Sequence, residues 1–248
     1  MSNAGSLHRG DDGHIMWCRP EPRRIRSNED DLPGEELLMT IRCNNGLVIS
    51  KMTGKMDGFY ALNTSPMMNE FCEKMASTSG TVCSNCYSRR MCTTFRRNAE
   101  RVWTNNGVIL SESIIPPSDL PSVDCFSKNG AFRFSAHGEL INDTHLINLI
   151  HIAEKSPDTI CSLWTKRASL VRNHLDAIPD NMLLIYSTPR IDPVTPIRPD
   201  GFDKTFSVYS HSGAEHMNID INCSGKCNTC MLCYRRDNSI IYVNEHAK

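Results

Sequence analysis

Four cysteines lie within eleven residues near the carboxyl end of the sequence: Cys223, Cys227, Cys230 and Cys233. Thiolates are soft ligands that suit zinc and iron-sulfur clusters, and connections of two or three residues let neighbouring sulfurs reach one centre. Structural zinc usually draws paired thiols from two separated knuckles, whereas one tight run is more typical of iron-sulfur ligation. The run therefore predicts a metal centre, with a [4Fe-4S] cluster favoured and zinc as the alternative.

A second group of cysteines comes earlier in the sequence. Cys83 and Cys86 are separated by two residues, with Cys72 upstream and Cys92 downstream. A single pair at this spacing is also typical of a zinc knuckle or of two unrelated thiols. Together with the carboxyl-terminal run, the group gives two hypotheses: each group holds its own cluster, or the two groups close onto one shared site. Spacing leaves both open, and it leaves open whether Cys92 is a ligand.

Polar side chains follow three predicted strands at the point where each strand ends. Glu139 comes after the first of these strands, Lys166 after the second and Arg190 after the third. A carboxylate beside a glycine can hold an ammonium group, and Lys166 and Arg190 can hold a carboxylate or a phosphate. We therefore predict catalytic roles for these three residues on a small-molecule or nucleotide-like substrate. Ordinary capping and surface charge are the alternative.

The elements that must position these residues are predicted by hydrophobic periodicity. A hairpin is expected over residues 37–50, a loop over 65–87 and a helix over about 86–103. Strands are predicted at 131–135, 159–165, 182–187, 205–209 and 240–243, with helices at 143–155 and 169–178. Strands alternating with helices indicate βαβ units. The expected fold class is α/β: a partial (β/α) barrel or an open parallel sheet, with an amino-terminal β-hairpin and cysteine-rich metal-binding segments.

The domain organisation follows from composition. Residues 1–35 are polar, charged and rich in glycine and proline, which predicts a flexible amino-terminal arm. Residues 36–248 are expected to form a single α/β domain, with cysteine-rich segments at 72–92 and 223–233. The twelve cysteines occur without an export signal, which favours a reducing compartment. No apolar stretch is long enough to cross a membrane, so we expect a cytoplasmic protein with no membrane partner.

The net charge of -1 excludes a global field that would attract nucleic acid. The arginines of the expected helix at 89–101 provide a local basic surface, which could contact nucleic acid or could be a solvated face. The alternative function is accordingly a zinc-stabilised module that binds nucleic acid or has a structural role. The sequence leaves the oligomeric state undetermined.

Five segments in the same order resemble a known family. They are Cys86-Tyr87, Asn98-Ala-Glu-Arg-Val-Trp-Thr-Asn105, Phe132-Arg-Phe-Ser-Ala-His-Gly-Glu139, Leu163-Trp-Thr-Lys166 and Ile178-Pro-Asp-Asn181. Together they resemble the phage gene product 88 family, over roughly residues 47–243. The family usually has Ser-Gly-Asp where this chain has His137-Gly138-Glu139. The resemblance implies a phage-encoded protein in the cytoplasm of a bacterial host.

The family in turn is similar to the radical S-adenosylmethionine enzymes. Those enzymes use a partial (β/α) barrel, hold a [4Fe-4S] cluster with three cysteines and bind the cofactor's amino group near a Gly-Gly-Glu after the second strand. The similarity implies Cys72, Cys83 and Cys86 as ligands, and His137, Gly138 and Glu139 as the cofactor-binding residues. Their CxxxCxxC spacing is absent near the front of this chain, where Cys72, Cys83 and Cys86 lie. Near the carboxyl end, Cys223, Cys227 and Cys230 reproduce it. The predicted function is redox or radical-type chemistry by an iron-sulfur protein.

Overall fold

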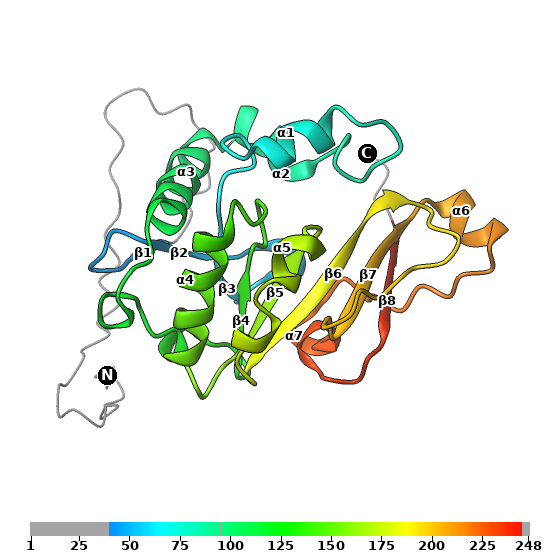
Figure 1. Ribbon diagram of the computed structural model, residues 1–248. Coiled ribbons are helices and arrows are strands. Elements are labelled where there is room, and N and C mark those ends of the chain that lie inside the picture. Colours follow the sequence, from blue (N-terminus) through cyan, green and yellow to red (C-terminus); the bar gives the residue numbers. More distant parts are fainter. Residues whose placement is uncertain (1–39, 95, 245–248) are drawn as a thin grey trace, which may run out of the picture.

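The strands of this protein form one sheet. The structure, a computed structural model, describes residues 40–94 and 96–244, and its eight strands are arranged in sequence order (Figure 1). The strands are β1 (Thr40–Arg42), β2 (Val48–Lys51), β3 (Tyr60–Leu62), β4 (Ala131–Phe134), β5 (Ile160–Thr165), β6 (Met182–Ile191), β7 (Lys204–Tyr209) and β8 (Ile240–Asn244). The arm expected over residues 1–35 lies outside the described residues.

The sheet is mixed rather than wholly parallel, which corrects part of the expected fold class. The hairpin of β1 and β2 is confirmed, but it continues into the sheet because β2 pairs antiparallel with β3. From β3 to β8, every neighbouring pair is parallel. Within the described residues β1 and β8 are the two ends of the strand order, so the α/β sheet is open and closure into a barrel is not seen.

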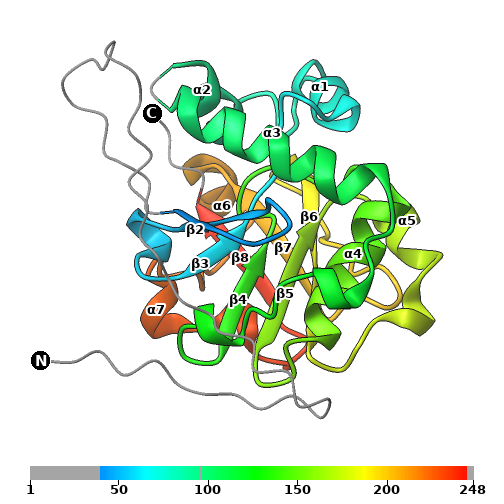
Figure 2. The ribbon, with the colours of Figure 1, turned by 90° about the vertical axis from the view of Figure 1, so that its left-hand side faces the viewer.

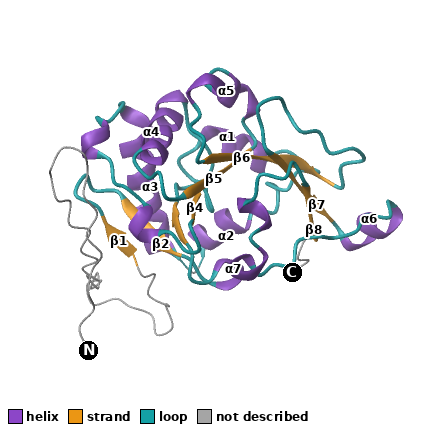
Figure 3. Cartoon of the chain, turned by 90° about the horizontal axis from the view of Figure 1, so that it is seen from below, coloured by secondary structure: helices purple, strands orange, loops and turns teal. Residues whose placement is uncertain are grey.

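Helices cover one face of the sheet and the cysteine-rich segment before β8 covers the other (Figure 3). The helices are α1 (Glu70–Ala76), α2 (Tyr87–Thr93), α3 (Arg97–Glu112), α4 (Asp143–Glu154), α5 (Ala168–Arg172), α6 (His211–His216) and α7 (Cys227–Cys230). Side chains of α3, α4 and α5 pack on the sheet in the larger core. Tyr234 packs on the opposite face with Phe59 and Ala131 in a smaller core.

Residue alternation in β4 explains how one strand serves both faces. Phe132 and Phe134 are fully buried and point into the helix-covered core, whereas Ala131 belongs to the smaller core of the opposite face. Successive side chains of a strand point to opposite faces, so Arg133 shares the face of Ala131. This places a guanidinium beneath the carboxyl-terminal cysteine-rich segment.

Four local features differ from the expectations. The single helix expected over 86–103 is interrupted after Thr93, and its second part continues to Glu112 as α3. The segment 65–87 is not wholly a loop, because it contains α1, a helix without buried residues and therefore without hydrophobic periodicity. The strand β3 was not expected from the sequence, since its three residues are too few for a pattern. The helix predicted at 169–178 is the shorter α5 followed by a 3-10 turn.

The remaining elements are confirmed within a few residues. For α4, Asn142 caps the helix by accepting a hydrogen bond from the His145 amide at 2.9 Å. No helix in the described part of the chain is both long and apolar enough to span a membrane.

Candidate functional site

Three cysteines lie near one another above the carboxyl ends of the parallel strands. Cys72 lies in α1, Cys83 in the following loop and Cys86 at the start of α2, and we call them the front thiols. Each of Cys83 and Cys86 raises the pKa of the Cys72 thiol through its charge, which shows that the three lie in one neighbourhood. The arrows of β4 and β5 in Figure 2 point towards the layer of α1, α2 and α3. The front thiols therefore occupy the edge where loops of a parallel sheet converge.

The loop that carries Cys83 is fixed to the end of β6. Thr81 forms an antiparallel bridge with Arg190, and the Val82 amide donates to the Pro189 carbonyl at 2.9 Å. The next turn is closed by the Cys86 amide, which donates to the Cys83 carbonyl at 3.2 Å. The Cys86 sulfur accepts from the Arg89 amide at 3.5 Å at the first turn of α2. Backbone contacts thus hold two of the front thiols in place.

Glu139 and Lys166 contribute opposite charges to the same neighbourhood. Burial raises the pKa of Cys72, the Glu139 carboxylate raises it further, and Lys166 lowers it. Burial likewise raises the pKa of Cys83, against the lowering effect of the Lys166 ammonium. Without a bound cation these two thiols are therefore protonated at neutral pH, and a metal ion or cluster would have to displace their protons.

The Glu139 carboxylate is engaged by the protein itself. Its side chain is buried and accepts hydrogen bonds from the Thr165 hydroxyl and from the Leu140 and Lys166 amides, the last two at 2.9 Å. These partners join the loop after β4 to the loop after β5. Asn69, at the start of α1, adds a bond to the Glu139 carbonyl at 3.1 Å. Glu139 consequently braces the carboxyl edge rather than presenting an unoccupied carboxylate.

His137 and Gly138 are also held by contacts within the protein. The His137 ring stacks on Trp103 at 4.4 Å between centroids, and its Nδ1 is 2.7 Å from the Ser88 hydroxyl. Burial, with the charges of Arg133 and Arg96, lowers the pKa of His137 to about 3, so the imidazole is neutral at physiological pH. Gly138 has a φ of +85°, and a Cβ there would lie 2.3 Å from the Thr64 carbonyl oxygen. Only glycine fits this position.

The structure separates Arg190 from the other predicted catalytic residues. Lys166 donates to the Ser187 hydroxyl at 3.2 Å, so its ammonium stays at the carboxyl edge. Arg190 is exposed, and no hydrogen bond or ion pair of the described residues joins it to Glu139 or Lys166. Two of the three predicted catalytic residues are therefore neighbours, and the third contributes its backbone to holding the Cys83 loop.

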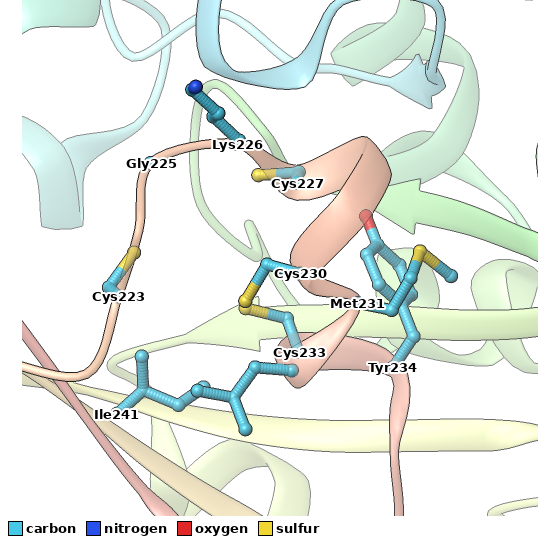
Figure 4. A pocket seen from close by; sticks show the side chains of 10 residues that line it. Cys223, Gly225, Lys226, Cys227, Cys230, Met231, Cys233, Tyr234 and Ile241 are labelled. Carbon is cyan, nitrogen blue, oxygen red and sulfur yellow. The ribbon is translucent and has the colours of Figure 1, made fainter.

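The carboxyl-terminal cysteines form a second group, which we call the rear thiols: Cys223, Cys227, Cys230 and Cys233. Figure 4 shows their side chains around one cavity of about 20 Å³, which Tyr234 and Ile241 also line. Burial raises the pKa of Cys233 to about 12, while the Arg133 guanidinium lowers it and the other three thiols raise it. Arg133 belongs to the surroundings of this group and was not predicted, because only the strand alternation places it there.

The two groups of thiols lie at different places in the fold. The front thiols are beside α1 and α2, and the rear thiols are beside α7, across the sheet from the helix layer (Figures 2 and 3). The hypothesis of one shared site is therefore wrong. Within residues 40–94 and 96–244, no three His, Cys, Asp or Glu side chains are close enough together to hold a metal ion. A metal at either group requires the sulfurs to move inward.

Comparison with known proteins gives one family. The model of a family described as gene product 88 matches residues 41–215. This range includes the front thiols, Glu139 and Lys166 and ends before the rear thiols. Neither the curated proteins nor the solved structures include a match.

Proposed function

The chain belongs to the gene product 88 family, and from this membership and the geometry of its carboxyl edge we propose that it is a phage iron-sulfur protein. In this proposal Cys72, Cys83 and Cys86 hold a [4Fe-4S] cluster. The protein carries out redox or radical-type chemistry on a small or nucleotide-like substrate. The proposal covers the front thiols alone, and the rear thiols are treated separately below.

The observation that supports it is the gathering of three thiols with a lysine at one edge of the sheet. Cys72 and Cys83 both respond to the charges of Glu139 and Lys166, which arrive from the loops after two neighbouring strands. The donor set fits the cluster, because thiolates are the usual ligands of iron-sulfur centres. A cluster held by three thiolates supplies one-electron transfer and leaves one iron open to a cofactor such as S-adenosylmethionine or to substrate.

The order of the site along the sheet also supports the proposal. Because β3 precedes β4, Gly138 and Glu139 follow the second of the parallel strands. A resemblance to the radical S-adenosylmethionine enzymes would put the cofactor's amino group at this position. Here the Glu139 carboxylate is already bound by Thr165, Leu140 and Lys166, so we assign it a positioning role. Its oxygens would accept a hydrogen bond from an amino group only in addition to these three.

Lys166 and His137 are the side chains that remain to act on a bound molecule. The Lys166 ammonium contacts Ser187 through one hydrogen bond and can donate two more, which suits a carboxylate or phosphate of the substrate. The neutral His137 exchanges one hydrogen bond with Ser88 through Nδ1. In the proposal Lys166 orients the substrate, while Glu139 keeps the Lys166 backbone beside the front thiols.

The experiment is iron and acid-labile sulfide analysis of the full chain purified without oxygen. We expect about four irons and four sulfides per chain in the unmodified protein, and almost none in the double variant Cys83→Ser/Cys86→Ser. Cys125→Ser is the matched control, since this cysteine is exposed and belongs to neither group of thiols. Iron and sulfide that persist in the double variant would contradict the assignment, as would an iron-free unmodified protein.

A second candidate function is supported by the arginines of α2 and α3. Arg90, Arg97 and Arg101 are exposed, and no acidic side chain in the described residues pairs with them. Glu100, the nearest acid in sequence, instead accepts hydrogen bonds from Ser65 and Thr104. We propose that this surface contacts the phosphates of a nucleic acid.

For this surface we expect the affinity for a single-stranded oligonucleotide to fall steeply as salt rises. Each lost phosphate contact reduces the slope of log affinity against log salt by ~0.7 for a single strand. The variant Arg97→Ser/Arg101→Ser should therefore reduce the slope by ~1.4. Arg172→Ser, at an exposed position on α5, is the control. Fluorescence anisotropy measures both, and binding that does not depend on salt would rule the surface out.

A further inference from the structure

The rear thiols surround a space that the proposed iron-sulfur function does not use. The cavity of about 20 Å³ is lined by all four cysteines. Figure 4 shows the side chains of Cys230 and Cys233 together, with Cys223 to their left and Cys227 above them. On this measure ~10–15 Å³ holds a single water molecule. The space therefore has room for one ion.

The local backbone brings the four sulfurs to this space. Cys227 and Cys230 begin and end the short helix α7, so their side chains lie one turn apart. Met231 then takes a left-handed conformation with φ of +53°, which reverses the chain and returns Cys233 to the cavity. Cys223 is held separately, because its amide donates to the Tyr242 carbonyl of β8 at 3.1 Å. The backbone therefore places all four cysteines in the lining of this cavity, and their sulfurs must move inward to share one ion.

A half-buried cation beneath the cavity lacks a counter-charge among the described residues. The Arg133 guanidinium stacks 3.8 Å from the centre of the Trp164 ring and donates to the Met56 sulfur at 3.3 Å. Its Nε is buried without a hydrogen-bond partner, and no carboxylate of the described residues pairs with it. A buried charge is costly unless an opposite charge lies nearby. Thiolates in the cavity would supply that charge.

We propose that Cys223, Cys227, Cys230 and Cys233 bind a single zinc ion as a tetrahedral tetrathiolate site. Binding releases four thiol protons and involves no change of oxidation state, so the occupied centre has a charge of -2. Arg133 and Lys55 balance this charge, since both act on the Cys227 thiol and Lys55 also lies beside Gly225. Four thiolates are the ligands of many structural zinc sites.

The zinc site would fix the long connection between β7 and β8. The connection is also attached to the sheet by the fully buried Lys204, whose ammonium pairs with Asp237 and donates to Ser239 at 2.8 Å, and by Arg236, which donates to the Met182 carbonyl at 2.8 Å. The site is therefore structural. Its test is independent of the iron-sulfur proposal, which concerns other cysteines at the carboxyl edge of the sheet.

The test is metal analysis of the full chain after anaerobic purification from medium that contains zinc. We expect about one zinc per chain, lost in Cys227→Ser/Cys230→Ser and kept in the front-thiol variant Cys83→Ser/Cys86→Ser. Substitution with Co²⁺ should give the sulfur-to-cobalt charge-transfer bands of tetrahedral thiolate ligation. If the rear double variant does not fold, chelator titration of the unmodified chain after thiol modification still measures the zinc that the cysteines release.

The variant Arg133→Met removes the positive charge beside the rear thiols and keeps all four cysteines. Removal of a group that supports metal ligands typically reduces affinity ~10- to 100-fold, and we expect a loss in this range for zinc. Arg172→Met is the control, because this arginine is exposed on α5. Zinc retained by the rear double variant, or iron and sulfide lost with the rear cysteines, would each overturn the proposal.

Discussion

Replacing Glu139 with alanine is expected to lower the free energy of unfolding by about 3–5 kcal/mol. The carboxylate is buried and accepts hydrogen bonds from the Thr165 hydroxyl and from the Leu140 and Lys166 amides. Truncation would leave three donors without a partner, and each unsatisfied buried group costs about 1–3 kcal/mol. Urea unfolding followed by far-UV circular dichroism measures the change.

Two further variants test whether the loss of stability comes from the hydrogen bonds of Glu139. Glu154→Ala removes an exposed glutamate at the end of α4 and should change the free energy of unfolding by less than about 0.5 kcal/mol. Glu139→Gln keeps the shape but directs an amide NH₂ at one of the donors, so an intermediate loss is expected. If Glu139→Ala retained full stability and lost only cofactor binding, Glu139 would be a cofactor ligand and not the brace described above.

Replacing Asn106 with alanine is expected to cost about 3–4 kcal/mol of stability. This fully buried residue of α3 accepts from the Val48 amide at 2.8 Å and donates to the Val48 carbonyl at 2.8 Å and to the Asn63 carbonyl at 2.9 Å. It is therefore a polar link between α3, β2 and the segment after β3. The loss would leave backbone groups of β2 and of the segment after β3 without these partners in the buried interior.

The neighbouring residue provides a matched control. Asn105 also donates to a backbone carbonyl, that of Gly46 at 3.1 Å, but its side chain is exposed and water can replace it. Asn105→Ala should therefore cost less than about 1 kcal/mol in the same urea experiment. Equal losses for the two variants would show that the buried network does not contribute the stability assigned to it.

Elements with a long, regular hydrophobic pattern were predictable from sequence. The strand at Ala131–Phe134 and the helix at Asp143–Glu154 were expected within about one residue, since burial on one face imposes a period that the sequence displays. β3 and α1 were missed because a three-residue strand and a helix without buried residues display no period. The interruption between α2 and α3 was also missed. Met91, Cys92, Ala99 and Trp103 pack together across it, a contact that local propensity does not encode.

The sequence by itself determined which chemical groups this protein has available: two sets of clustered thiols, a Gly-Glu pair after a strand and a lysine after the next. The tertiary structure alone decided their surroundings. It placed one set of thiols at the carboxyl edge of the sheet and the other set on one face, engaged Glu139 with donors 26 and 27 residues away, exposed Arg190 and placed Arg133 beneath the rear thiols. The physical reason is that side-chain type is local, whereas burial, hydrogen-bond partners and neighbouring charges depend on which distant segments the sheet brings together.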